Sequence, residues 1–280
     1  MALAACSVSL VVTVVVVIIS IINSVKSGNA ATGSFKYFTV LSNILTALAS
    51  SFIIPFAING IRKKRFVMPK WLSMMHYAGV TCITLVFIFN LGFILPYSKQ
   101  DAIGGNNLFL HIICPIAVVL SFFLVESGYR YTKKEIAICM IPFMIYSFVY
   151  VAMVVFVGEE NGGWPDLYML NTLQPAYISF PLVWGMMLLI AFVIRKVSDL
   201  LRKRRTVKMF EAWGEDTEPV EVKVEMYGLG RYYGLSGDKN NLSVPFDILE
   251  DVAERFNMKT EELYEAYVKG LLNGIKERGN

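Results

Sequence analysis

The 280-residue chain is 55% apolar, only 17% of its residues are charged, and its mean hydropathy is +0.54. Soluble domains carry about a quarter charged residues, so this composition excludes an ordinary water-soluble globular protein and indicates an integral membrane protein. The charge is divided along the chain. Residues 1–205 hold 17 Lys and Arg against 7 Asp and Glu, whereas residues 206–280 hold 9 against 15. A basic, apolar part followed by an acidic, polar part predicts two separate domains.

Six apolar segments are long enough to cross a membrane, since about 20 apolar residues span a hydrocarbon core of about 30 Å. The first lacks the basic start of a signal peptide, so we expect it to be retained as a helix. The sequence therefore predicts an all-α, polytopic membrane domain of six transmembrane helices within residues 1–205. The six segments are residues 5–23, 37–60, 71–96, 107–126, 136–157 and 176–195.

Basic residues are unevenly distributed among the loops of this domain. Fourteen of its 17 Lys and Arg lie in residues 61–70, in residues 127–135 and after residue 194. The positive-inside rule places these segments in the cytoplasm. The sequence thus predicts a multi-pass protein of the cell membrane with both termini in the cytoplasm, and the second, fourth and sixth spans run from outside to inside.

Polar side chains recur near the outer ends of the spans, where we expect them to face the bundle interior. Thr39 and His111 lie a few residues inside the second and fourth spans. At 1.5 Å per residue they share a depth in the outer leaflet. Asn43 lies one turn from Thr39 on the same helix face, and Asn90 and Tyr150 lie in the outer halves of the third and fifth spans. These five residues are predicted to converge on one pocket.

Each of these residues also has a purely structural interpretation. A threonine in a membrane helix commonly bonds back to a carbonyl of the preceding turn, and Asn43 and Asn90 can join helices through hydrogen bonds. The other histidine, His76, is placed near the inner end of the third span, in the opposite leaflet from Thr39. His111 is therefore the histidine positioned to act on the Thr39 hydroxyl.

A Thr39–His111 pair is suited to cleaving an ester through an acyl-enzyme. Histidine is the commonest general base near neutral pH, and a hydroxyl beside it can attack a carbonyl carbon. Asn43, Asn90 or Tyr150 would then donate hydrogen bonds to the oxyanion. Neither a metal nor an organic cofactor is required. These groups are the ones that ester cleavage in a dry site requires.

Two short stretches, "FKYFTVLSNIL" at 35–45 and "LHIICP" at 110–115, carry a family resemblance. Together they resemble the androgen-induced-gene family of six-pass membrane threonine hydrolases, and the chain is identified as a prokaryotic-type member. The segment "NGGWPDLYML" at 161–170 is similar, more loosely, to the loop before that family's last span. Characterised animal members hydrolyse fatty acid esters of hydroxy fatty acids. The resemblance implies that Thr39 is the nucleophile and that His111 is the essential histidine. It therefore implies a lipid-ester hydrolase that acts within the membrane on fatty acyl esters from the outer leaflet.

The acidic end of the chain is predicted to form a small cytoplasmic α+β module over residues 220–280, after an acidic linker at 206–219. The stretch "VEVKVEMYGLGRYYGL" alternates apolar and polar residues, with Gly228 and Gly230 at a turn, and so predicts a β-hairpin.

Two helices are predicted after this hairpin, over residues 245–257 and 261–276. The acidity of the module argues against nucleic acid as a partner. Homo-oligomer formation, binding of a cytoplasmic partner, or a role only as a stabilising cap all fit it.

Two other functions fit the same sequence. A non-catalytic membrane scaffold or sensor would use the polar cluster only to pack helices and the module after residue 220 to contact a partner. An acyltransferase would use Thr39 and His111 as described, with an alcohol in place of water. A transporter is disfavoured, because no acidic residue lies in the middle of a span and the spans show no clear internal repeat.

Overall fold

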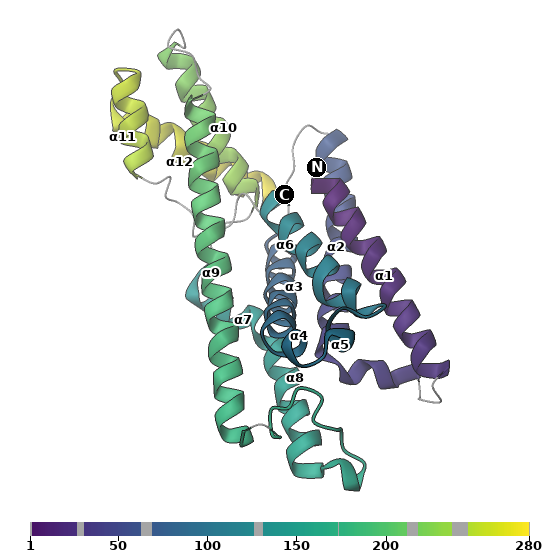
Figure 1. The fold of residues 1–280 in the computed structure, drawn as a ribbon. Coiled ribbons are helices and arrows are strands. Elements are labelled where there is room, and N and C mark those ends of the chain that lie inside the picture. Colours follow the sequence, from purple (N-terminus) through teal and green to yellow (C-terminus); the bar gives the residue numbers. More distant parts are fainter. Residues whose placement is uncertain are drawn as a thin grey trace. The chain divides into compact units, whose positions relative to one another are not determined.

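The computed structural model describes residues 2–26, 31–62, 69–125, 131–172, 174–211, 218–236 and 246–279. All regular secondary structure within these ranges is helical (Figure 1). The chain divides into two compact units. The first comprises Met1–Ile58, Met74–Val125 and Thr132–Ile194, and the second comprises Asn59–Ser73, Glu126–Tyr131 and Arg195–Asn280.

The helices of the first unit include three π-helical segments, which interrupt or extend ordinary α-helices. Three of its helices, α2, α3 and α9, also extend into the second unit. In chain order the elements are α1 (Ala2–Lys26), the 3-10 helix η1 (Ala31–Lys36), α2 (Phe38–Arg62), α3 (Lys70–Phe89), the π-helix η2 (Asn90–Ile94), α4 (Leu95–Tyr97), α5 (Lys99–Ile103), the π-helix η3 (Phe109–Ile113), α6 (Cys114–Val125), α7 (Lys133–Cys139), α8 (Ile141–Val151), the π-helix η4 (Ala152–Val157), the 3-10 helix η5 (Glu159–Asn161) and α9 (Ala176–Glu211).

Three helical segments are long and apolar enough to cross a membrane, namely Phe38–Ile58, Lys70–Tyr97 and Ala176–Leu201. They coincide with the predicted second, third and sixth spans. The pair Lys133–Cys139 and Ile141–Val157 adds a fourth if these two helices, bent by 43° at their junction, form a single span. The described residues therefore contain three candidate spans, or four, and the prediction of six transmembrane helices is wrong.

The predicted first and fourth spans are not among these candidates. Within α1, which has 25 residues, the apolar stretch identified among the described residues is Leu10–Ile19, and in the fourth region it is Phe109–Phe123. Both stretches are shorter than the roughly 20 apolar residues that cross a hydrocarbon core.

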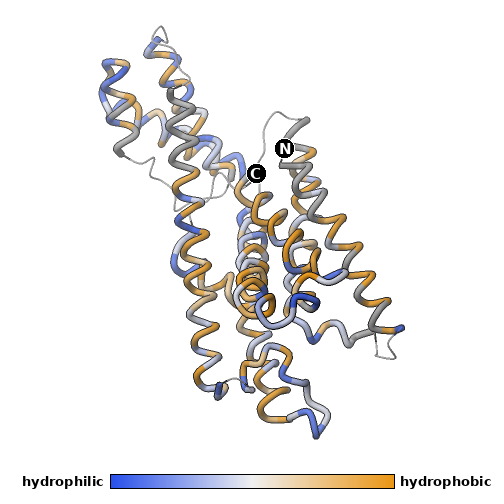
Figure 2. The backbone as a smooth tube through the Cα atoms, in the orientation of Figure 1, coloured by the Kyte–Doolittle hydropathy of each residue, from blue (hydrophilic) through white to orange (hydrophobic). Residues whose placement is uncertain are grey.

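The first unit buries polar as well as apolar side chains, and it exposes many large apolar ones. Along α2, one side of the helix carries the buried residues Thr39, Asn43, Thr46 and Ser50, while Leu48 and Phe52 are exposed. Figure 2 shows apolar residues over most of α6 and along the coloured parts of α1 as well. Lipid solvates apolar side chains, and polar groups in a membrane find partners inside the bundle. The chain is thus a helical protein whose apolar helices are suited to a membrane.

The C-terminal part of the second unit contains three helices, α10 (Pro219–Ser236), α11 (Phe246–Arg255) and α12 (Thr260–Gly279). The last two coincide with the helices predicted there. The predicted linker at 206–219 is in part the end of α9, and its residues 212–217 lie outside the described residues. The same is true of 237–245, where a loop and the start of a helix were predicted.

The predicted β-hairpin is wrong, because α10 is a single helix over those residues. Val222 and Met226 are fully buried, whereas Val220 and Val224 are 67% and 62% exposed. Buried positions four residues apart follow the period of a helix, not the period of two that a strand requires. The alternation of valine with charged residues was therefore coincidental, and the described part of the module is helical rather than α+β.

Two pairs of glycines explain how α10 and α12 approach each other. Gly230 and Gly234 on α10, like Gly270 and Gly274 on α12, are four residues apart. A Cβ atom at any of them would collide with the other helix, whose nearest atoms are the carbonyls of Tyr267, Leu271, Tyr227 and Arg231, respectively. Close backbone contact of this kind needs small residues on both helices. The residue numbers of the contacting positions increase together along the two helices, so α10 and α12 run parallel.

Candidate active site

A cavity in the first unit brings together residues from α2, α3, η2, η3, α8, α9 and the loop between η5 and α9. It is partly open to its surroundings, and its empty space together with the open solvent at its mouth amounts to about 590 Å³. Of the described residues that line it, none is acidic or basic apart from His111. Its polar lining residues are Thr39, His111, Tyr146, Ser147, Tyr150 and Tyr168, and its apolar ones are Phe38, Leu85, Val86, Phe89, Ile94, Phe143, Leu170, Phe180 and Val183.

Thr39 lies in the first turn of α2, which begins at Phe38. It is buried, and its carbonyl oxygen accepts hydrogen bonds from Ser42 Oγ (3.0 Å) and Asn43 Nδ2 (2.7 Å). No turn of α2 precedes Thr39, so a carbonyl of the same helix is not available to its hydroxyl. Its side chain interacts instead with the hydroxyl of Tyr168. Ser42, which bonds back to its own helix, has the structural role expected of a membrane serine.

His111 lies on the π-helix η3 and is buried against α5. Its Nδ1 is 3.1 Å from the carbonyl oxygen of Ala102. Because a carbonyl oxygen only accepts hydrogen bonds, Nδ1 must carry the proton. In the neutral ring the lone pair is then on Nε2, which is the arrangement a general base requires. The Ala102 carbonyl orients the ring here in the way a carboxylate does in many hydrolases.

Asn43 joins the two segments that carry Thr39 and His111. It is fully buried, and its Nδ2 donates to the carbonyl of Thr39 (2.7 Å) and to that of Leu110 (3.4 Å), the residue before His111. It does not line the cavity. The structure therefore gives Asn43 a positioning role, different from the oxyanion contact that the sequence suggested.

Asn90, at the start of the π-helix η2, does not line the cavity either. It is fully buried. Among the described residues, neither its Nδ2 nor its Oδ1 has a hydrogen-bond partner. A buried amide left unpaired costs about 1–3 kcal/mol, and we have no physical account of why it is retained.

Tyr150 lines the cavity, but its hydroxyl proton is already engaged. The hydroxyl donates to Asp166 Oδ1 (2.9 Å) and accepts from the backbone N–H of Tyr168 (3.2 Å). A hydroxyl has one proton to donate. Tyr150 therefore holds the loop that contains Asp166 and Tyr168, and is poorly suited to donate to an oxyanion.

Asp166 organises that loop, and sequence reasoning did not single it out. Its carboxylate accepts hydrogen bonds from the N–H groups of Leu170, Asn171 and Thr172 and from the hydroxyls of Thr172 and Tyr150, all at 2.8–3.0 Å. Partial burial raises the pKa of Asp166. The hydrogen bonds stabilise the charged form more strongly, so the pKa lies below its ordinary value. The Pro165–Asp166 dipeptide is a turn signal that sequence reasoning could have used.

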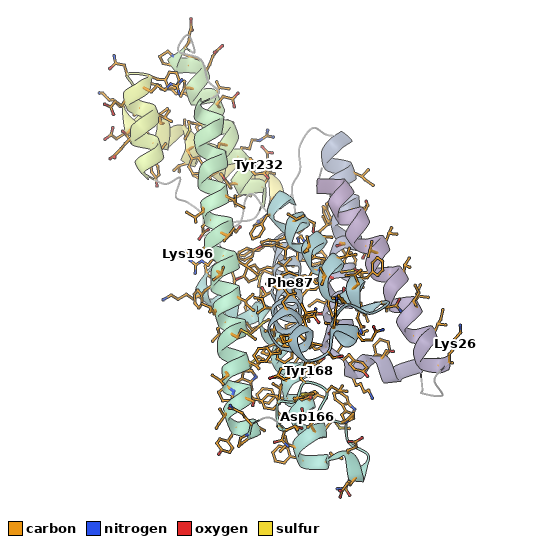
Figure 3. The ribbon with its side chains drawn as sticks, viewed as in Figure 1. Lys26, Phe87, Asp166, Tyr168, Lys196 and Tyr232 are labelled. Carbon is orange, nitrogen blue, oxygen red and sulfur yellow. The ribbon has the colours of Figure 1, made fainter. Side chains whose placement is uncertain are left out.

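Tyr168 is the second residue that sequence reasoning missed. Its hydroxyl oxygen accepts a hydrogen bond of 2.7 Å from the backbone N–H of Phe38, at the start of α2. The side chains of Tyr146 and Thr39 also interact with this hydroxyl. Figure 3 shows Tyr168 close to Asp166, in the loop that precedes α9. Burial raises the pKa of Tyr168, so its phenol keeps its proton at neutral pH.

The three π-helical segments occur around this cavity. Ile94 of η2 and His111 of η3 line it, and η4 begins two residues after Tyr150. Short π-helices are rare and are frequent at functional sites. They support the choice of this cavity as the candidate site. His76, by contrast, does not line the cavity and packs edge-on against Phe122, with ring centroids 5.2 Å apart.

No protein-family model, curated protein or solved structure matches this chain. The resemblance to the androgen-induced-gene family therefore stays a prediction that rests on the two short sequence motifs. In the residues that the structure describes, no three His, Cys, Asp or Glu side chains are grouped so that they could hold a metal ion. The candidate site is thus defined by its own geometry, as a cavity with a threonine hydroxyl, an oriented histidine and a loop tyrosine.

Proposed function

We propose that the chain is a membrane-bound carboxylic ester hydrolase in which Thr39 is the nucleophile and His111 is the general base. The observation that carries the proposal is that Thr39 and His111, from different helices, line the same apolar cavity. The bond from His111 Nδ1 to the Ala102 carbonyl supports it further, because it leaves Nε2 free to take a proton. An acyl-enzyme mechanism needs these two groups and a site shielded from bulk water.

The reaction would proceed in two steps. First, Nε2 of His111 takes the hydroxyl proton of Thr39 while the Thr39 oxygen bonds to the acyl carbon, and the carbonyl electrons move onto the oxygen. Collapse of this intermediate breaks the bond to the leaving alkoxy oxygen, which receives the proton from His111. Water then attacks the acyl-threonine and gives a proton to Nε2, the bond to the Thr39 oxygen breaks, and the proton returns to Thr39.

The substrate class follows from the lining of the cavity. Nine of the lining residues are apolar, and no acidic or lysine or arginine side chain is among the described ones. A charged head group inside the cavity would be left without a counter-ion, at high cost in an apolar environment. A neutral ester with a fatty acyl chain fits, and such a substrate would enter from the membrane.

The orientation of the protein in the cell membrane is part of the proposal. Basic residues follow α2 and continue along the end of α9, so the positive-inside rule favours the cytoplasm for these ends. Thr39 lies at the opposite end of α2. The site would then open in the outer leaflet, and the C-terminal helices α10–α12 would lie in the cytoplasm.

Hydrolysis of a p-nitrophenyl acyl ester by the purified protein in detergent micelles tests the proposal. Thr39→Ala and His111→Ala should each lower kcat by at least about 10³-fold, since each removes a group that takes part in bond making. Thr84→Val is the matched control, because its hydroxyl bonds only back to Val80 (2.7 Å) and does not line the cavity. Full activity in both active-site variants would refute the proposal and favour the scaffold interpretation.

A further inference from the structure

The hydroxyl of Tyr168 is held beside Thr39 by the start of α2. Its oxygen is 2.7 Å from the N–H of Phe38, the residue directly before the proposed nucleophile. The first N–H groups of a helix have no partner within the helix, so this bond satisfies one of them. Because Phe38 can only donate here, the Tyr168 oxygen is the acceptor and its own proton points elsewhere.

The side chains of Tyr146 and Thr39 interact with the Tyr168 hydroxyl, and the Tyr146 proton is itself donated to the carbonyl of Lys36 (2.8 Å). Among the described residues, no backbone carbonyl or carboxylate accepts the Tyr168 proton in a hydrogen bond. Tyr168 lines the same cavity as Thr39 and His111. A hydrogen bond from Tyr168 to a substrate in this cavity would therefore replace only a contact with a neighbouring hydroxyl.

We propose that Tyr168 is a catalytic residue whose hydroxyl donates a hydrogen bond to the oxyanion that forms when Thr39 attacks the ester. This proposal rests on the proposed ester hydrolysis and adds a third group to it. As the Thr39 oxygen bonds to the acyl carbon, negative charge develops on the former carbonyl oxygen, one bond away from that carbon. The Tyr168 proton stays on its phenol oxygen throughout, so proton transfer remains with His111.

The other candidate donors are less suited to this role. The Tyr150 proton is donated to Asp166, and the Asn43 amide is shared between two backbone carbonyls. Asn90 does not line the cavity. Preorganised donors contribute most when the protein already fixes them before the reaction. Tyr168 is fixed by Phe38 on one side and, through the hydrogen bonds of its loop, by Asp166 on the other.

An inhibitor pair separates this role from a structural one. A long-chain trifluoromethyl ketone can accept the Thr39 oxygen and form an oxyanion, whereas the matched secondary alcohol cannot. The ratio of their inhibition constants therefore reports stabilisation of the oxyanion alone. Loss of a donor typically lowers such stabilisation by about 10²–10³-fold. We expect Tyr168→Phe to reduce the preference for the ketone by roughly 10²-fold and to lower kcat similarly, with KM nearly unchanged.

Tyr150→Phe is the matched comparison, because it removes a phenol hydroxyl from the same cavity that supports the Tyr168 loop without donating to the oxyanion. It should lower the ratio of the inhibition constants less than Tyr168→Phe does. An unchanged or increased ratio in Tyr168→Phe overturns the proposed role of Tyr168. If the unmodified protein shows no preference for the ketone that depends on Thr39, the proposed function itself fails, and the role of Tyr168 fails with it.

Discussion

The first unit and the helices α10–α12 differ in the side chains that they bury and expose. The first unit buries Thr39, Asn43, Thr46, Asn90 and His111 together with many apolar residues, and it also exposes many large apolar side chains. The second packs apolar residues into a core and leaves charged residues at its surface. That core contains Val222, Met226, Leu249, Val252, Leu263, Tyr267 and Leu271.

This difference shows which surroundings each region is built for. In water, burial of apolar surface is the main favourable term in folding, at about 25 cal/mol per Å². In lipid that term largely disappears between helices, and close packing and hydrogen bonds remain. One chain therefore contains two folding environments. If lipid solvates the apolar outer face of the first unit, as we propose, its buried polar residues need not be balanced by a polar surface.

Among the variants that test this difference between the two regions, Gly270→Val in α12 is expected to have the largest effect on stability. A side chain at Gly270 would collide with the carbonyl of Tyr227 on α10. Backbone cannot move aside cheaply, so we expect α10 and α12 to separate and the module to lose on the order of 4 kcal/mol of stability. Limited proteolysis of the full chain should show rapid cleavage within residues 219–279.

Gly228→Ala is the control for this variant, because nothing lies within 4 Å of the added Cβ atom. Alanine in a helix interior is favoured over glycine by about 0.5–1 kcal/mol, so this variant should resist proteolysis at least as well as the unmodified protein. Equal protease resistance in Gly270→Val and Gly228→Ala would show that the close glycine contact does not form.

An intermediate effect is expected when lysine replaces one of two equally exposed leucines. Leu189 on α9 is 63% exposed and Leu272 on α12 is 58% exposed. Leu189→Lys puts a charge in a candidate span, which costs about 2.5–3.5 kcal/mol in insertion. Leu272→Lys, in a module built for water, should be almost neutral. The membrane-inserted fraction after alkaline extraction should fall only for Leu189→Lys. Identical fractions would contradict the assignment of the two environments.

The smallest effect concerns acid stability of the loop that carries Tyr168. The pKa of Asp166 is lower in the folded protein than its ordinary value. The carboxylate therefore contributes stability above its ordinary pKa, and that contribution is lost as the pH falls through the folded-state value. Thermal unfolding in detergent should show a lower Tm at pH 3 than at pH 6. Asp166→Asn should reduce this difference, and an unaltered difference would exclude Asp166 as its source.

Sequence patterns were informative where the structure depends on local composition. The three unbroken spans follow from runs of apolar residues, and α11 and α12 follow from their helical periodicity. Counting residues from the outer ends of the predicted spans placed Thr39 and His111 at the same depth in the membrane. In the structure both residues line one cavity. The α10 helix was missed because its valines alternate with charged residues, and only burial distinguishes Val222 from Val224.

The rest of the site depends on contacts that no local pattern contains. The hydrogen bond from the backbone N–H of Phe38 to the Tyr168 hydroxyl joins residues 130 positions apart in the sequence. The hydrogen bond from the Asn43 amide to the Leu110 carbonyl joins residues 67 positions apart. The π-helical segments that carry His111 and adjoin Tyr150 have no sequence signature of their own. The bend between α7 and α8 does have a local signal, since Pro142 lies in the first turn of α8.

Mapping the residue that a covalent ester-hydrolase probe modifies tests the central claim most directly. The full-length protein in detergent would be treated with a long-chain fluorophosphonate, digested, and analysed by tandem mass spectrometry. The account predicts one modified residue, Thr39, and no modification in His111→Ala. Modification of a different residue, or of Thr39 to the same extent in His111→Ala, would contradict a Thr39–His111 ester hydrolase, as would the absence of any modification.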